Sequence, residues 1–358
     1  MKNRIEKLRA KLAEEQIDSL LVSSSVNIRY LTGLSSSNAL LLIGLEGEFL
    51  ITDFRYEEEA RSKASGCEIR IAQDQLWEEF SLLPPRVLGE KMGFESQHLP
   101  FEQYLKLKDT LPSSVSLVPK RDLIENFSVI KDKGEIEKIQ RAVEITDRVF
   151  EQILPLVKPG ISEQELAAEI DYRIRKSGGE RAAFNTIVAS GERSSMPHAT
   201  PTGRRIQSGE LVLMDFGAVF DGYASDFTRT VVVGEATREQ KQRYALVHQA
   251  QREAIKKAKA GMNSCELDRT ARQIIENAGY GPNFRHSLGH GIGLQIHEAP
   301  RISWKDGVVL KPGMVITVEP GIYIPGWGGI RIENVILIKE EGCEELTKTD
   351  TEFICLQY

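Results

Sequence analysis

Four acidic residues in the second half of the chain stand beside apolar residues, where carboxylates are unusual. Asp215 and Asp226 lie within LVLMDFGAVFDGYASDFTRTVVV at 211–233, and Glu319 and Glu333 follow further along the chain. Placing carboxylates among apolar side chains is costly unless a counter-charge accompanies them. Two divalent cations would neutralise the four negative charges, so these acids indicate a metal site.

The two aspartates are predicted to project from one face of a β-hairpin. The dipeptide Asp221-Gly222, between two apolar runs, is typical of a two-residue hairpin turn. With that turn, Asp215 and Asp226 are diagonal neighbours about 7 Å apart or less between their Cβ atoms, and Gly217 leaves room beside Asp226. A pair of water-solvated aspartates at a loop end is the alternative for these two residues alone. The two glutamates favour the metal site.

Three of the six histidines, His286, His290 and His297, lie in the glycine-rich segment FRHSLGHGIGLQIHEAP at 284–300. Its glycines are expected to let the backbone pass close to a ligand or metal. Imidazole and carboxylates without thiolates favour a first-row ion such as Mn, Co, Fe or Zn over a closed structural zinc site. Two such ions about 3.5–4 Å apart would turn a bridging water into hydroxide and polarise a carbonyl, which predicts metal-assisted hydrolysis.

The apolar pattern divides the chain into two parts. At 358 residues the chain exceeds the size at which a single core usually stops growing. The N-terminal third alternates short apolar runs with charged helical stretches, which indicates a small α/β domain with a mixed sheet. The runs are 19–22, 39–43, 49–51, 68–71 and 115–118, and the stretches include 56–63 and 101–111. A boundary near residue 128 gives domains 1–128 and 129–358.

The second part begins with a long helix and contains a degenerate internal repeat. Apolar residues that step by three and four through 136–157, apart from one threonine, predict an apolar helix face. KPGISEQEL at 158–166 aligns with KAGMNSCEL at 259–267, and GELVLMDFG at 209–217 aligns with GMVITVEPG at 313–321. Each half is expected to run helix, break, helix and strands. This order places Glu319 in the position of Asp215 and brings the acids to one centre.

Composition and charge narrow the class of protein. Hydrophobic residues at 41% and charged residues at 27% are those of an ordinary soluble globular protein. The net charge of −6 and the pI near 5.7 argue against nucleic acid as a partner. The N-terminus lacks the apolar region of a secretory signal, and the longest apolar run, 39–45, is too short for a membrane span, so a cytoplasmic protein is expected. His98 and His248 are expected to be structural or surface residues.

Six segments, spread over the whole chain, match a known family pattern. They are MPHATPTGR, VLMDFGAVFDGYASDFTRT, HSLGHGIGLQIHE, KPGMVITVEPGIYIPGWGGIRIEN and, in the first domain, NIRYLTGL and DFRYEEEA. These segments resemble the pita-bread metallopeptidases, specifically the aminopeptidase P and prolidase branch. The resemblance implies an α/β N-terminal domain, an α+β C-terminal pita-bread domain with a pseudo-twofold internal repeat, and a homodimer.

The resemblance also implies a set of metal ligands. Asp215 and Asp226 would ligate one metal ion, His290 and Glu319 would ligate the other, and Asp226 and Glu333 would bridge both. Glu319 is counted among the catalytic residues as well. The expected cofactor is two divalent metal ions per subunit, with Mn first and Co, Zn or Fe as alternatives. All five family ligand positions are present, which argues for an active enzyme.

Further residues are implied to act on the substrate or to support the site. His198 and His297 correspond to catalytic histidines that position the substrate or handle a proton, and His286 to a supporting histidine of the substrate-binding region. Arg331 is implied to be a catalytic residue that steadies the bridging Glu333. A plain loop histidine at 198 and a surface ion pair at 331 are the alternatives.

The expected activity is hydrolysis of the peptide bond before proline by the metal-bridging hydroxide. An Xaa-Pro bond is a tertiary amide without an N–H, so the substrate must be oriented by other groups. Arg301, four residues after His297, could bind the free carboxylate of a dipeptide. This residue favours an Xaa-Pro dipeptidase, prolidase-like, over an Xaa-Pro aminopeptidase that acts on longer peptides. A non-catalytic peptide-binding scaffold and a different pita-bread hydrolase are the remaining alternatives.

Overall fold

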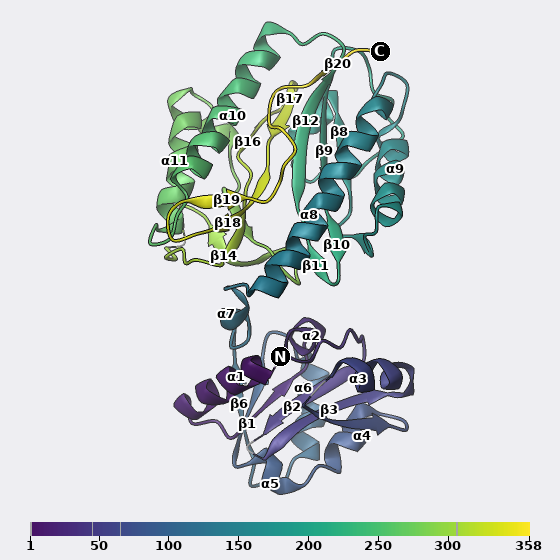
Figure 1. Cartoon of the computed structure of the whole chain (residues 1–358), viewed down its shortest axis with the longest axis vertical. Coiled ribbons are helices and arrows are strands. Elements are labelled where there is room, and N and C mark those ends of the chain that lie inside the picture. The colour runs from purple at the N-terminus through teal and green to yellow at the C-terminus, as the bar shows by residue number, and fades with distance from the viewer. Residues whose placement is uncertain (1, 45, 65, 306) are drawn as a thin grey trace. The chain divides into compact units, whose positions relative to one another are not determined.

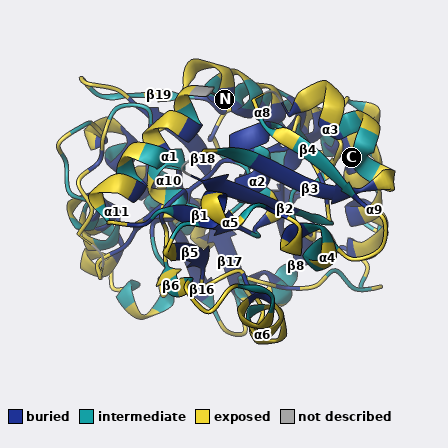
Figure 2. Ribbon diagram, turned by 90° about the horizontal axis from the view of Figure 1, so that it is seen from below, coloured by how far each residue is buried: buried dark blue, intermediate teal, exposed yellow. Residues whose placement is uncertain are grey.

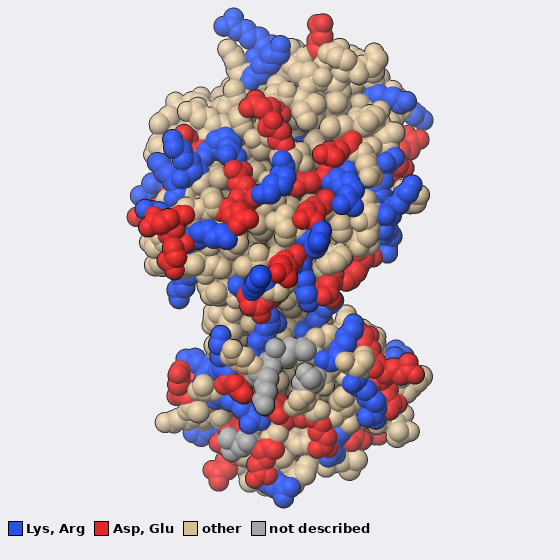
Figure 3. All heavy atoms as spheres, viewed as in Figure 1, with Lys and Arg blue, Asp and Glu red and all other residues tan. Residues whose placement is uncertain are grey.

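The chain forms two units, Met1–Ser128 and Val129–Tyr358, in the computed structural model, which describes residues 2–44, 46–64, 66–305 and 307–358 (Figure 1). Within those ranges, none of the helices combines the length and apolarity needed to cross a membrane. Basic and acidic side chains are interspersed on the face shown in Figure 3.

A six-stranded mixed sheet forms the centre of the first unit. Its strand order is β4-β3-β2-β1-β5-β6, in which β2 runs antiparallel to both of its neighbours and the other pairs are parallel. The strands are β1 (Ser19–Val22), β2 (Ala39–Gly44), β3 (Gly47–Asp53), β4 (Glu68–Ala72), β5 (Lys91–Glu95) and β6 (Ser116–Lys120). The helices are α1 (Lys2–Glu14), α2 (Ser25–Thr32), α3 (Glu57–Lys63), α4 (Leu76–Ser81), α5 (Pro85–Leu88), α6 (Phe101–Thr110) and α7 (Glu125–Ser128). β1, β2 and most of β3 are buried and appear dark blue in Figure 2.

The mixed sheet predicted for the first unit is confirmed, with one strand that the apolar runs do not predict. β5 lies between β1 and β6 and pairs with both. Its buried Met92 and Phe94 alternate with Lys91, Gly93 and Glu95, so no continuous apolar run marks it. Its place in the interior of the sheet comes from its two parallel partners, which are distant in the sequence.

In the first half of the second unit, two helices accompany a four-stranded sheet. The helices are α8 (Lys133–Ile153) and α9 (Glu163–Lys176). The sheet has the order β20-β12-β9-β8, with β8 (Ile187–Ser190), β9 (Leu211–Phe216), β12 (Phe227–Val233) and β20 (Cys355–Leu356), and a smaller sheet contains β7 (Arg181–Ala182), β10 (Ala218–Phe220) and β11 (Tyr223–Ala224). The predicted apolar face of α8 is confirmed, because Val143, Phe150 and Ile153 are buried in it.

The second half has the same order of elements. Its helices are α10 (Arg238–Lys257) and α11 (Ser264–Asn277), and its five-stranded sheet has the order β14-β13-β15-β18-β19. The strands are β13 (Gly289–Gly291), β14 (Glu298–Ile302), β15 (Val315–Val318), β18 (Asn334–Ile338) and β19 (Cys343–Glu345), and β16 (Gly321–Ile324) pairs separately with β17 (Gly328–Arg331). Short 3-10 turns occur at Phe54–Tyr56, Leu154–Leu156, Gly191–Ser195 and Gly281–Asn283.

The internal repeat is visible in the backbone pairing of the two halves. An isolated antiparallel bridge joins Ser162 to Arg205 just before α9, and another joins Asn263 to Val309 just before α11. The sequence alignment places Ser162 and Asn263 at equivalent positions. β9 contains Asp215 and β15 leads directly into Glu319, so the predicted correspondence of these two acids is confirmed.

Candidate metal centre

The hairpin formed by β9 and β12 places the two aspartates on one face. Asp215 lies opposite Thr228 in the antiparallel pair, which is the register that a two-residue turn requires. The hairpin is interrupted at Gly217, where an added Cβ atom would lie 2.1 Å from the carbonyl oxygen of Ser225. Only glycine fits at this close approach, and the strand resumes immediately after Asp226.

The glycines on either side of His290 let its strand pack closely against the neighbouring strands. A Cβ atom on Gly289 would lie 2.0 Å from the carbonyl oxygen of Thr317, and one on Gly291 would lie 2.1 Å from that of Ala299. β13 is therefore held tightly between β14 and β15, which pair with it on either side. The close packing fixes the backbone of His290.

Hydrogen bonds then aim the imidazole of His290 at the acids. Its Nδ1 donates to the carbonyl oxygen of Gly291 at 3.0 Å. Its Nε2 lies 3.3 Å from Oε1 of Glu319 and 3.5 Å from Oδ2 of Asp226. Thr317 connects the same group, because its Oγ1 accepts from the backbone nitrogen of His290 and donates to Oε1 of Glu319.

Two buried carboxylate oxygens in this cluster have no hydrogen-bond partner among the described residues. They are Oδ1 of Asp215 and Oε1 of Glu333. The other oxygen of Glu333 accepts from Thr228 Oγ1 at 2.7 Å. Ligand atoms of Asp226, His290 and Glu333 all lie within 4.8 Å of one another. Because buried polar atoms nearly always have a partner, this set of oxygens and one imidazole nitrogen fits divalent cations.

The electrostatics of the cluster show how strongly the acids need a positive charge. Burial raises the pKa of Glu333 well above its ordinary value, and the neighbouring acids raise it further. Burial likewise raises the pKa of Asp215 to about 7. Burial also raises the pKa of Glu319, but the hydrogen bond with His290 and the positive charges of His290, His286 and Arg331 together outweigh that effect and bring its pKa to about 2. The pKa of His290 is raised well above its ordinary value by Asp226 and Glu319, against the effect of burial, and a cation would replace its Nε2 proton.

Arg331, which is expected to steady Glu333, contacts three other side chains. The buried Arg331 contacts Asp215 through Nη2, donates to the hydroxyl of Tyr323 through Nη1 at 2.7 Å, and donates to Oγ1 of Thr228 through Nε at 3.1 Å. Arg331 ends β17, and Glu333 lies in the short connection between β17 and β18. Among the described residues, Thr228 links the two side chains, because its Oγ1 accepts from Nε of Arg331 and donates to Oε2 of Glu333. The burial of Arg331 also excludes a surface ion pair.

His286 lies behind this arrangement. Its Nδ1 donates to the carbonyl oxygen of Ser287 at 2.8 Å, so its Nε2 accepts from the hydroxyl of Tyr323 at 3.0 Å. Burial lowers the pKa of His286, which keeps the ring neutral and preserves this acceptor. The contacts connect His286 through Tyr323 to Arg331 and Asp215.

Three predicted substrate residues are exposed near His290. The rings of His297 and His290 have centroids 4.4 Å apart. Burial lowers the pKa of His297, and the charges of His290 and His198 lower it further, which places His198 in the same neighbourhood. Arg301 lies opposite His290 in the pairing of β13 with β14, so its side chain leaves the same face of the sheet.

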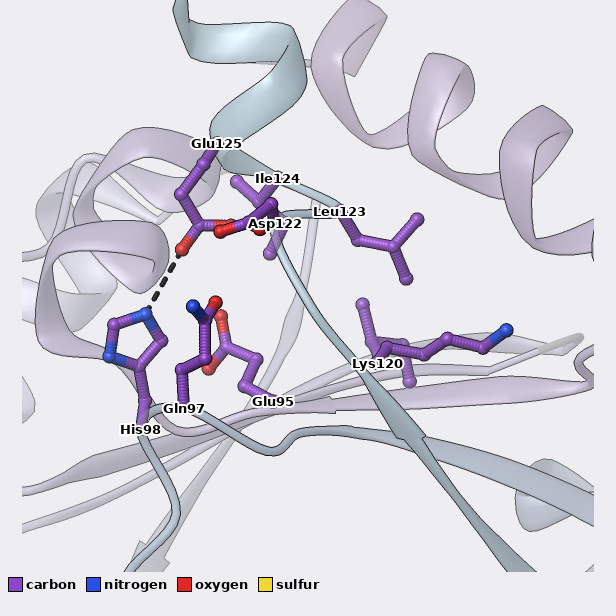
Figure 4. Close-up of a pocket in the computed structure, with 9 residues that line it drawn as sticks. Glu95, Gln97, His98, Lys120, Asp122, Leu123, Ile124 and Glu125 are labelled. Atoms are coloured by element: carbon purple, nitrogen blue, oxygen red, sulfur yellow. Dashed lines mark hydrogen bonds and ion pairs between the residues drawn. The ribbon is translucent and has the colours of Figure 1, made fainter. Parts of the chain in front are cut away.

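The other two predicted histidines lie outside the acid cluster. The ring of His98 in the first unit points toward Glu125, with Nε2 3.1 Å from its Oε1 (Figure 4). His248 on α10 has its Nε2 2.9 Å from Oγ1 of Thr351. Both contacts are those of structural residues.

Three residues of the centre are missed by reasoning from the sequence. Thr228 could have been found, because the hairpin register places it opposite Asp215. Thr317 and Tyr323 lie close in the sequence to Glu319, a predicted ligand. Their roles depend on contacts with Glu319 and Arg331, respectively, that no local sequence pattern indicates.

The fold and the site define a hydrolase with a metal centre, of the metallopeptidase class. The model of Metallopeptidase family M24 matches residues 137–340, and that of the Creatinase/Prolidase N-terminal domain matches residues 4–129. The chain therefore belongs to metallopeptidase family M24. Membership implies divalent-metal binding, and the predicted fold class is confirmed.

Relatives carry names from both branches that the sequence predicts. The Xaa-Pro dipeptidase of Pyrococcus furiosus is 40% identical over 358 residues, which cover 99% of this chain and 100% of that protein. The solved structure of an Xaa-Pro dipeptidase from Bacillus anthracis has a TM-score of 0.96 and 40% identity, with 99% of each chain covered. That of an X-Pro aminopeptidase from Thermotoga maritima MSB8 has a TM-score of 0.90 and 35% identity, covering 95% of this chain and 98% of that one.

Proposed function

We propose that this chain is an Xaa-Pro dipeptidase whose five ligands hold two divalent metal ions, with Mn as the first choice and Co, Zn or Fe as alternatives. The ligands are Asp215, Asp226, His290, Glu319 and Glu333. The observation that carries the proposal is a pair of buried oxygens, on Asp215 and Glu333, that have no hydrogen-bond partner among the described residues of this member of family M24. When bound, the ions would activate water and polarise the substrate carbonyl.

The chain's own residues then have separate tasks. The pKa of His297 lies below its ordinary value, so the ring is neutral near pH 7 and can accept a proton from the reacting groups. His198, in the same neighbourhood, would position the substrate. Arg331 and Tyr323 hold Asp215 and exclude water from the side of the site where they are buried.

Dipeptide specificity rests on Arg301. A dipeptide has its free carboxylate one residue beyond the bond that is cleaved, and a guanidinium can bind a carboxylate bidentately. A longer peptide has an amide there. Relatives named as dipeptidases and as an aminopeptidase both align over almost the whole chain, so an Xaa-Pro aminopeptidase is the second candidate.

A hydrolysis panel tests the proposal. The purified protein would be assayed with Xaa-Pro dipeptides and Xaa-Pro-Yaa tripeptides in the presence of Mn, Co or Zn. We expect metal-dependent cleavage with a higher kcat/KM for dipeptides. A preference for tripeptides would favour the aminopeptidase, and a protein that neither binds metal nor cleaves any peptide would favour a binding scaffold.

A homodimer and a cytoplasmic location are proposed from the family resemblance, and sedimentation and cell fractionation would test them.

A further inference from the structure

The loop that carries His198 is held at both ends by one buried carboxylate. Glu163, the first residue of α9, is 0% exposed. Its Oε1 accepts from the backbone nitrogen and from Oγ of Ser190, both at 2.9 Å. Its Oε2 accepts from the backbone nitrogen and Oγ1 of Thr202, at 3.0 and 2.8 Å. Ser190 ends β8 just before the loop and Thr202 follows His198, so a single side chain joins both ends.

Arg193 connects the interior of the loop to the same carboxylate. Its Nε lies 3.2 Å from Oε1 and 3.1 Å from Oε2 of Glu163, and its Nη2 donates to the carbonyl oxygen of Thr200 at 2.7 Å. Thr200 is two residues from His198. Burial raises the pKa of Glu163, but the hydrogen bonds from Ser190 and Thr202 outweigh it and lower the pKa overall. The carboxylate is therefore ionised at neutral pH and accepts from every one of these donors.

The remaining flank of the loop is fixed on β17. Ser194 Oγ accepts from the backbone nitrogen of Gly329 at 2.8 Å. A Cβ atom on Gly329 would lie 2.1 Å from the carbonyl oxygen of Ser194, so the two backbones are in close contact. Only a short segment is left to project, and in it Met196 and His198 are exposed. The contacts on both sides of this segment therefore restrict the position of His198.

In the other half of the repeat, a serine stands at the position of Glu163. The sequence alignment pairs Glu163 with Ser264, which is buried and whose Oγ accepts from the backbone nitrogen of Val308 at 3.1 Å. The bridges before α9 and α11 are equivalent in the two halves. The two halves therefore differ at this position, and the glutamate occurs in the half whose loop carries His198.

We propose that Glu163 is a positioning residue. It fixes the loop between Ser190 and Thr202 and so holds the side chain of His198 in the position needed for turnover. The proposal rests on the proposed function, in which His198 positions the substrate. It adds a buried residue that touches no substrate and acts entirely through the loop. Arg193 contributes to the same positioning, because it links Glu163 to the interior of the loop.

A double-mutant cycle tests this role. Glu163→Gln keeps the shape of the side chain but turns one acceptor oxygen into a donor that faces other donors. We expect kcat for an Xaa-Pro dipeptide to fall about 10- to 100-fold, the range for partners that orient a functional group, with metal content unchanged. In a His198→Ala background the same change should lower kcat less than about twofold, because the loop then has no histidine to position.

Glu165→Gln is the matched control. Glu165 lies in the same turn of α9, and its carboxylate accepts from the backbone nitrogen and Oγ of Ser162. Its loss weakens the start of the helix but leaves the contacts of the His198 loop intact. We expect kcat to stay within about twofold of the wild type, since surface changes of this kind usually have small effects.

Amide hydrogen exchange supplies a readout that does not depend on activity. Residues 191–202 should exchange faster in Glu163→Gln than in the wild type, and at the wild-type rate in Glu165→Gln. Equal factors of kcat loss in both His198 backgrounds, or unchanged exchange of the loop, would overturn the proposal. If the wild type cleaves no Xaa-Pro peptide, the proposed function fails, while the exchange data still decide whether Glu163 holds the loop. Should Glu163→Gln not fold, Arg193→Gln replaces it, with the same signs expected.

Discussion

Two buried glutamates, one in each unit, have opposite surroundings. Glu95, at the end of β5 in the first unit, accepts at Oε2 from the backbone nitrogens of Ser23 and Ser24, at 2.6 and 2.8 Å. Its Oε1 accepts from Nδ2 of Asn27 at 2.5 Å (Figure 4 shows Glu95 beside its sheet). Glu333 in the catalytic unit accepts only from Thr228 among the described residues.

The difference separates a structural acid from a functional one. Burial raises the pKa of both side chains. Around Glu95 the hydrogen bonds from Asn27, Ser24 and Ser23 offset part of this rise and Glu125 adds a smaller one, whereas around Glu333 the neighbouring acids are the main effect after burial and raise the pKa further. A buried carboxylate whose oxygens are satisfied stabilises its fold, since removing it would leave donors unpaired. One left beside other carboxylates destabilises the protein until a cation binds. Such local conflicts are expected at functional sites.

The largest effect is expected for Glu333→Ala. Loss of this carboxylate would leave the metal ions under-coordinated, while the fold should persist because the side chain contributes repulsion to the metal-free protein. We expect turnover to fall more than about 100-fold, beyond the 10- to 100-fold typical of residues that only orient metal ligands. Circular dichroism, turnover and metal content should be measured together. A variant with more than about a tenth of the wild-type rate would contradict the bridging role.

A smaller loss is expected for His297→Ala, which lies beside the cluster without contributing a carboxylate. If His297 moves a proton, kcat/KM should fall about 100-fold, the lower end of the range for proton transfer by a positioned side chain, and the metal ions should stay bound. The wild-type pH profile should be bell-shaped, and its acid limb should shift in the variant, because the neutral ring is the active form. Loss of both ions from the variant would show that His297 is a ligand, and the separation of metal-binding acids from exposed histidines would then be wrong.

The comparison extends to two arginines, one buried and one exposed. Arg331 is buried and has three partners, while Arg301 is exposed on the face that carries His290. We expect Arg301→Ala to lower kcat/KM for Xaa-Pro dipeptides about 10- to 100-fold, which is about 1.4–3 kcal/mol, through loss of a charged hydrogen bond. Cleavage of Xaa-Pro-Yaa tripeptides should be largely spared. Equal losses for both lengths would remove the basis for a dipeptidase.

Reasoning from the sequence finds most of the metal centre because local rules determine it. The Asp221-Gly222 turn sets the hairpin register, and the register alone places Asp215 and Asp226 on one face. The repeat then supplies Glu319. These inferences need only turn chemistry and strand periodicity.

The supporting residues escape such reasoning because their partners are distant in the chain. Glu163 appears in its segment only as a helix-starting residue after Ser162, and nothing local indicates its contacts with Ser190 and Thr202. Arg331 is two residues from Glu333, yet its partner is Asp215, because the chain leaves β17 between them. β5 is missed in the same way, since pairing with β1 and β6 decides its place in the sheet.

The smallest effect is expected for Glu95→Gln, which tests the other side of the comparison. The amide can still accept from Ser23 and Ser24, but its nitrogen would face Nδ2 of Asn27, so we expect a loss of about 1 kcal/mol in the stability of the first unit. Activity should stay at the wild-type level. The sign of the pH dependence follows from burial, which raises the pKa of Glu95 above its unfolded value of 4.5 despite the hydrogen bonds from Asn27, Ser24 and Ser23.

As the pH rises above 4.5, the glutamate of the unfolded chain ionises first, which favours unfolding until the pH passes the raised pKa of the folded state. The wild type therefore loses stability relative to the glutamine variant over this window, and the deficit of Glu95→Gln should be larger at pH 4 than at pH 7.5. Hydrogen exchange of the amides in β1 and β5 is the suitable measurement, because two units need not unfold together. If the stability deficit of Glu95→Gln instead grows with pH, the folded protein stabilises the ionised form of Glu95. The surroundings of Glu95 and Glu333 would then differ in more than their hydrogen bonds.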